Sequence, residues 1–198
     1  MNKRLYKIFL FFSLFSIVGG LIPTSIYAES DASSYSDADR KEWGKRSKPV
    51  PLGEEKEITY KPFLSDPVTM RVTLVEIIRG QDAIDKLIEY NSLNEYNVEK
   101  VAEGYEYNLV KFRIKYDEGS DDDAYSTPTS FWSVKVLDEK GKEVKDSSFV
   151  VLNDQEEFGG VELYPGSEHE GYYALIVPKD GKYTVSVKFG KPVFFASE

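Results

Sequence analysis

The sequence predicts an all-β protein, an immunoglobulin-like antiparallel β-sandwich with one short helix (about residues 81–91) in an early connection. Three observations support this fold class. Several segments alternate apolar and polar residues with a period of two, which is typical of strands that bury one face. Turn residues such as glycine, proline and aspartate separate these segments. A single stretch has helical spacing instead, so strands dominate the predicted architecture.

The first clear strand is followed directly by the helix. Residues 68–74 alternate apolar and polar side chains, and the alternation breaks at Val75, which predicts a bulge or the end of the strand. Ile84, Leu87 and Ile88 then recur at helical spacing, and Asp82 stands near the start of the stretch. This pattern predicts one amphipathic helix of about three turns.

Four later segments complete the clearest strands. Residues 107–116 place apolar side chains on one face and lysine or arginine on the other, and residues 132–136 repeat the alternation before a turn at 138–141. Residues 172–177 are almost continuously apolar, which predicts a strand in the centre of a sheet. Residues 183–189 alternate most regularly, after a glycine-containing turn.

The first 28 residues have the layout of a secretory signal peptide. Lys3, Arg4 and Lys7 precede an apolar run at residues 8–22, and a small-residue cleavage site ends at Ala28. As a helix this run would span about 22 Å, which is shorter than the roughly 30 Å hydrocarbon core of a bilayer. We therefore expect a secreted, extracellular protein. A retained N-terminal membrane anchor, with the domain facing outside, is the alternative.

The predicted organisation has three parts: a signal peptide at 1–28, a flexible linker at 29–50, and the sandwich domain at 51–198. The linker prediction follows from a Ser/Asp/Ala-rich stretch and then a basic stretch that ends before Pro49. Trp43 stands out in this segment. We expect it to dock either on the protein's own domain or on a partner.

Charge and cysteine content restrict the function. Three of the 25 basic residues and none of the 34 acidic ones lie in the signal segment, so residues 29–198 carry 22 basic and 34 acidic residues, a net charge of −12. Such a surface repels phosphate backbones and anionic lipid, which argues against a nucleic-acid partner. The chain has no cysteine, which excludes disulfides, thiolate metal sites and a lipidated cysteine.

Several short motifs occur in a familiar order between residues 52 and 190. They are Arg79-Gly80-Gln81-Asp82-Ala83, Glu103-Gly104-Tyr105-Glu106-Tyr107, Leu163-Tyr164-Pro165-Gly166 and Glu170-Gly171-Tyr172. This order resembles an exported, telokin-like family of unknown function in Gram-positive bacteria, whose fold is similar to immunoglobulin-like secreted antigens. The resemblance implies a β-sandwich outside the cytoplasm and implies no catalytic residue. Many relatives are lipoproteins, and this chain departs from them because it has no cysteine.

An acidic run at residues 117–123 is the most site-like feature. Clustered carboxylates in a loop can bind Ca²⁺, although the spacing does not match an EF-hand and a solvated hairpin tip is the simpler interpretation. Residues 117–130 and 153–160 form the pair of loops that we expect to present a contact surface. The candidate binding residues are Asp117, Glu118, Asp121, Asp122, Asp123, Tyr125 and Trp43.

The sequence offers no catalytic constellation. His169 is the single histidine, and Ser167 lies two residues before it, but no nucleophile elbow surrounds the serine. We expect a non-catalytic binding module, secreted or associated with the cell envelope, with an unknown extracellular or envelope protein as partner and no cofactor. The alternatives are a carboxylate- or metal-dependent extracellular hydrolase and a calcium-stabilised surface protein. The resemblance and the signal peptide favour the first.

Overall fold

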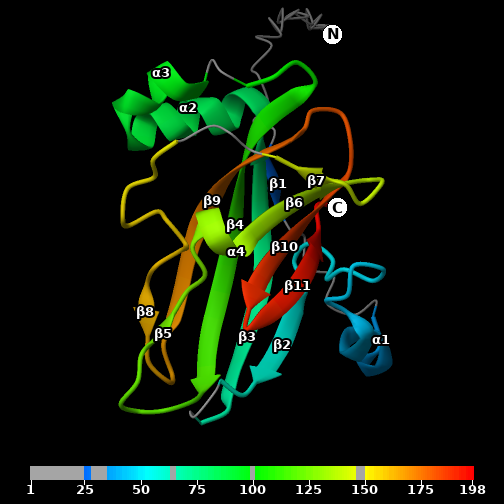
Figure 1. The fold of residues 1–198 in the computed structure, drawn as a ribbon, viewed down its shortest axis with the longest axis vertical. Helices are drawn as coiled ribbons and strands as arrows, with labels where there is room; N and C mark the ends of the chain where they lie inside the picture. The colour runs from blue at the N-terminus through cyan, green and yellow to red at the C-terminus, as the bar shows by residue number, and fades with distance from the viewer. Residues whose placement is uncertain (1–24, 28–34, 63–65, 99–100, 146–149) are drawn as a thin grey trace, which may run out of the picture.

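A computed structural model describes residues 25–27, 35–62, 66–98, 101–145 and 150–198 (Figure 1). Most of the predicted signal peptide therefore lies outside the described residues. The predicted fold class is confirmed: the chain forms an antiparallel β-sandwich, and one short helix lies in an early connection. No helix within the described ranges is long and apolar enough to cross a membrane.

The first sheet has five strands, and its long central members run the length of the molecule (Figure 1). Its strands pair in the order β1 (Ser25–Tyr27), β3 (Val68–Arg79), β4 (Tyr105–Glu118) and β9 (Glu168–Pro178). In addition, β2 (Glu55–Tyr60) pairs with the first half of β3, whereas β1 pairs with its last residues. Two short strands thus share one edge of β3.

The second sheet has four strands in the order β11 (Lys191–Ala196), β10 (Tyr183–Phe189), β6 (Val134–Asp138) and β7 (Glu143–Val144). The short strands β5 (Tyr125–Ser126) and β8 (Glu162–Leu163) pair with each other and form a separate two-stranded sheet. The helical segments are α1 (Asp37–Glu42), α2 (Gly80–Tyr90), η1 (Ser92–Asn94), α3 (Glu95–Val98) and α4 (Ser130–Ser133).

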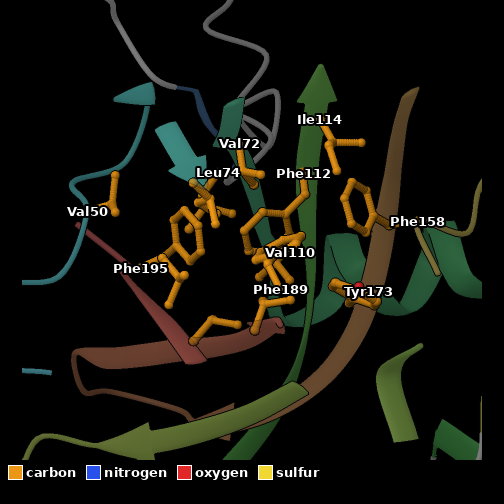
Figure 2. Close-up of a cluster of buried hydrophobic side chains, with 14 of the residues drawn as sticks. Val50, Val72, Leu74, Val110, Phe112, Ile114, Phe158, Tyr173, Phe189 and Phe195 are labelled. Carbon is orange, nitrogen blue, oxygen red and sulfur yellow. The ribbon is translucent and has the colours of Figure 1, made fainter. Parts of the chain in front are cut away.

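The main core lies between the two sheets and is rich in aromatic rings (Figure 2). Phe112 on β4 is at its centre, with ring centroids 5.0 Å from Phe195, 5.7 Å from Phe158 and 5.8 Å from Tyr173. The pairs with Phe195 and Tyr173 are edge to face and the pair with Phe158 is tilted, and such aromatic pairs add to the free energy gained from burying apolar area. Phe112 therefore packs against aromatic side chains from both sheets and from the loop that carries Phe158.

A second core lies on the other face of β4 and β9, under α2. Ala83 and Leu87 of the helix pack there with Tyr107 and Leu109 of β4 and Ile176 of β9. At residues 107–110 of β4 and 172–177 of β9, neighbouring residues consequently point into different cores, which explains why these apolar runs are so dense.

Several predicted elements are confirmed. Helix α2 occupies Gly80–Tyr90, close to the predicted residues 81–91. The register of β3 with β4 shifts between Leu74 and Glu76, so the break in alternation at Val75 marks a bulge. Strand β3 does not end at Val75 but continues past the bulge to Arg79.

Two strand predictions need correction. Trp132 was expected on a strand, but it lies in α4, and 80% of its surface is exposed. Residues 172–177 belong to β9, which stands at the end of the described pairing order of its sheet. The apolar run of β9 reflects its coverage on both faces by the two cores, which periodicity alone cannot distinguish from a central position.

The linker prediction also needs correction for residues 35–50, which pack against the sandwich. Ser36 caps α1 through a reciprocal capping box with Asp39. Trp43 follows the helix and is only 4% exposed, inside the main core. Val50 is fully buried, and its amide N donates to the carbonyl of Phe194 at 2.8 Å. The packed domain therefore begins well before residue 51.

Candidate interaction surface

The first acidic residue of the predicted site is part of an ion pair. The Arg71 guanidinium donates from Nε to Oδ2 of Asp117 at 2.7 Å and from Nη2 to Oδ1 at 2.6 Å. These hydrogen bonds lower the pKa of the Asp117 carboxyl below its ordinary value. Asp117 thus connects β4 to β3, while Glu118, the last residue of the strand, is exposed.

We predict that Arg71→Gln raises the pKa of Asp117 towards about 3.9, the value of an unperturbed aspartate. Because the folded pKa is depressed, the pair stabilises the fold above the unfolded pKa, and this contribution is lost as the pH falls through the folded pKa. Both side chains are partly exposed, so the contribution is at most about 1 kcal/mol. A carboxyl-detected NMR titration measures the shift, and an unchanged Asp117 pKa in the variant would contradict it.

The remaining aspartates of the acidic run are exposed. The backbone amides of Asp122 and Asp123 donate to Oγ of Ser120 at 3.3 and 3.2 Å, so the serine organises the turn. Asp121 also points to solvent. In the part of the chain that the structure describes, no three histidine, cysteine or acidic side chains come close enough to hold a metal ion.

The two aromatic residues of the predicted site have packing roles. Tyr125 lies in β5, with its ring 5.7 Å from that of Tyr116, and burial raises the pKa of its hydroxyl. Trp43 is buried in the main core, as described above, and the guanidinium of Arg40 stands 5.5 Å from its ring. Trp43 therefore docks on the protein's own domain, the first of the two outcomes expected for it.

The two predicted contact loops lie against each other. The Thr127 hydroxyl donates to the carbonyl of Phe158 at 2.7 Å, and the Gly160 amide donates to the carbonyl of Thr127 at 3.1 Å. The hydroxyl of Tyr173 also donates to the carbonyl of Pro128. These bonds hold the segment before α4 against the 153–160 loop and β9. Helix α4 therefore begins at a fixed place on the domain.

The most exposed aromatic pair, Phe131 and Trp132, is not among the binding residues predicted from the sequence. They are 66% and 80% exposed, and their rings meet edge to face with centroids 4.5 Å apart. Helix α4, which carries them, lies to the left of centre in Figure 1. A cavity of about 130 Å³ lies beside it, lined by Ser130 of the same helix and by Val151 and Tyr173.

A buried asparagine fixes the position of Val151, one of the residues that line this cavity. The carboxamide of Asn94 donates to the carbonyl of Val151 at 2.8 Å and accepts from the amide of Val151 at 2.8 Å, which fixes this exposed valine beside η1. Leu93 and Tyr96 flank Asn94 in sequence, and both are exposed. We call the exposed residues Phe131 and Trp132 of α4, together with exposed Val151 of the cavity, the apolar surface.

A buried polar chain lies behind the cavity. The hydroxyl of Tyr172 donates to Oε2 of buried Glu76 at 3.0 Å and accepts from Nζ of Lys86 at 3.2 Å. Burial, reinforced by the charge of Glu76, raises the pKa of Tyr172. Each of these three groups has a hydrogen-bond partner. The network therefore stabilises the wall of the cavity and joins α2 to β3 and β9.

Ser167 and His169 each bond to backbone carbonyls. The Ser167 hydroxyl donates to the carbonyl of Tyr164 at 2.6 Å. Nε2 of His169 lies 3.2 Å from the carbonyl of Glu157, and its ring stands 5.6 Å from that of Phe158. These contacts give both side chains structural positions at the start of β9.

Comparison with known proteins gives distant similarities of fold. No protein-family model matches the chain, and no curated protein matches it. Among solved structures, the yjhA protein from Bacillus subtilis is similar, with 15% identity, coverage of 70% of this chain and 79% of that one, and a TM-score of 0.40. A conserved hypothetical protein from Bacillus anthracis has 18% identity, coverage of 72% and 97%, and a TM-score of 0.35. Neither similarity carries an argument about function.

Proposed function

We propose that the chain is a non-catalytic binding module that works outside the cytoplasm and recognises a protein partner through the apolar surface. The exposed pair Phe131 and Trp132 carries this proposal. Exposed tryptophan and phenylalanine are depleted on ordinary surfaces and enriched at the centres of protein interfaces, where they supply much of the binding energy. The signal peptide and the resemblance to an exported family support the extracytoplasmic location.

The way in which the pair is presented also supports a protein partner. Hydrogen bonds at Thr127 and Tyr173 hold the segment before α4 on the sandwich, so the backbone that presents the two rings needs little ordering on binding. The adjoining cavity of about 130 Å³ offers a recess for one side chain of a partner. The net negative charge of the chain disfavours an anionic membrane as the alternative target of exposed aromatics.

We predict that the double variant Phe131→Ala/Trp132→Ala loses at least about 100-fold in affinity for the partner, because each residue of an interface centre contributes about 2 kcal/mol or more. Its stability should change little, since both side chains are exposed in the free protein. The partner is first identified by proximity labelling on intact cells, and binding is then measured by titration calorimetry with the purified partner.

Tyr164→Ala is the matched control, because Tyr164 is also an exposed aromatic residue but lies outside the apolar surface. The control should bind as the unmodified protein does. Equal binding by the double variant and the control would contradict the proposed surface. The location is tested separately by mass spectrometry of the protein from culture supernatant and from membranes. A chain found only in the cytoplasm would contradict that part of the proposal.

A further inference from the structure

A groove of about 510 Å³ lies between the end of α1, β2 and the start of β11. Although the protein is acidic overall, five basic side chains line this groove: Lys41, Lys45, Arg46, Lys56 and Lys191. Glu57 is the single carboxylate among its described lining residues. In Figure 1, α1 lies at the lower right, away from α4, so the groove is separate from the apolar surface.

Most of this positive charge has no carboxylate beside it. Lys45 pairs with Glu42 at 2.5 Å. By contrast, no acidic oxygen of the described residues lies within 4.0 Å of the charged ends of Lys41, Arg46 or Lys191. All three side chains line the groove and are exposed, and the guanidinium of Arg46 also lies close to Gly141 in the turn after β6.

Lys56 lies deeper than the other four and is held by backbone. Its Nζ donates to the carbonyls of Arg40 at 2.9 Å and Lys41 at 3.3 Å, at the C-terminal end of α1. Burial lowers the pKa of Lys56, and the charges of Lys191 and Lys45 also lower it, while those of Glu57 and Glu42 raise it. The basic residues that line the groove come from α1, the loop after it, β2 and β11, so the fold brings like charges together in spite of their mutual repulsion.

We propose that this groove binds a flexible polyanion that carries phosphate groups. The cations are spread over α1, the loop after it, β2 and β11, which suits several anionic groups in a row better than one small ion. Lysine and arginine are the usual partners of phosphate oxygens. Buried Trp43 and Val193 form an apolar wall that is fixed by the main core, so the groove is preformed.

Inorganic polyphosphate is the probe, and Trp43 is the reporter. The chain has two tryptophans, and Trp132→Phe leaves Trp43, beside the groove, as the single tryptophan, which can be excited selectively over the tyrosines. Titration at low ionic strength should give a saturable change in fluorescence. The logarithm of the affinity should fall linearly with the logarithm of the salt concentration, because binding releases counterions from the phosphates.

Adding Arg46→Gln/Lys191→Gln should weaken polyphosphate binding by about tenfold or more and reduce the salt slope by about 2, one for each charge removed. The matched control is Lys145→Gln/Lys179→Gln, which removes two exposed lysines that do not line the groove. The control should bind almost as the parent does. Equal weakening in both variants would show a general attraction to charge and would overturn the site.

A second arm tests the chemistry of the ligand. Poly-glutamate of matched charge should bind at least about tenfold more weakly, since its carboxylates lie on long flexible side chains and stand further apart than the phosphate groups of polyphosphate, so ordering them costs more conformational entropy. Equal binding of the two polymers would overturn the assignment to phosphate. Absence of saturable polyphosphate binding would overturn the groove as an anion site, whatever becomes of the apolar surface.

Discussion

Trp43→Ala should lower the free energy of unfolding by about 3–5 kcal/mol, the usual loss when a buried large aromatic is truncated. Trp43 is only 4% exposed and packs in the main core, so its removal leaves a cavity that the neighbouring strands cannot fill. This loss is a large fraction of the stability of an ordinary domain, about 5–15 kcal/mol. Denaturant unfolding of both proteins measures it.

The controls for this prediction separate a packed segment from a flexible one. Tyr35→Ala removes another aromatic of the same segment, which is exposed and meets the Trp43 ring edge to face, so it should cost about 1 kcal/mol. A chain that starts at residue 35 should be as stable as the mature protein, whereas one that starts at residue 51 also lacks Val50 and should be largely unfolded. An unchanged midpoint for the shorter chain would contradict the packing of residues 35–50.

Phe112→Ala should also cost about 3–5 kcal/mol, because Phe112 joins the two sheets through three aromatic neighbours. Phe112→Leu should cost less, since it retains more of the volume and keeps the variant folded enough to measure. The measurement is again the free energy of unfolding in denaturant, supported by the thermal midpoint.

Phe131→Ala is the matched control for this second prediction. It removes the same side chain from the surface of the domain, so the free energy of unfolding should change by no more than about 0.5 kcal/mol. Similar losses at positions 112 and 131 would contradict the assignment of Phe112 to the centre of the core.

Much of the fold could be predicted because alternation reports burial directly. β3, β4 and β10 each bury one face for most of their length, and the break at Val75 is a bulge in the ladder. The same logic failed for β9, because its two faces lie in two cores and alternation disappears. It failed at Trp132 as well, where the spacing of residues 132–136 imitates a strand but the first two of them close the short helix α4.

The site was less predictable because its contacts join distant parts of the chain. Asp117 pairs with Arg71, 46 positions earlier, and no local pattern indicates that pairing. The polar and charged composition of residues 29–50 predicts a flexible linker and does not indicate that Trp43 and Val50 belong to the core. One local signal was readable: Ser36 and Asp39 have the spacing of a capping box, which predicts the start of a helix in that segment.

Cleavage of the predicted signal peptide would have a structural consequence, because strand β1 lies within that peptide. Ser25, Ile26 and Tyr27 pair with Ile78, Ile77 and Glu76 on the edge of β3 that β2 leaves open. If cleavage occurs after Ala28, as the sequence predicts, the released peptide takes this strand with it. The precursor would then carry its own protective cover, and processing would unmask backbone groups that can pair with a strand from another chain. Signal-peptide cleavage would therefore change the exposed surface of the domain as well as the location of the protein.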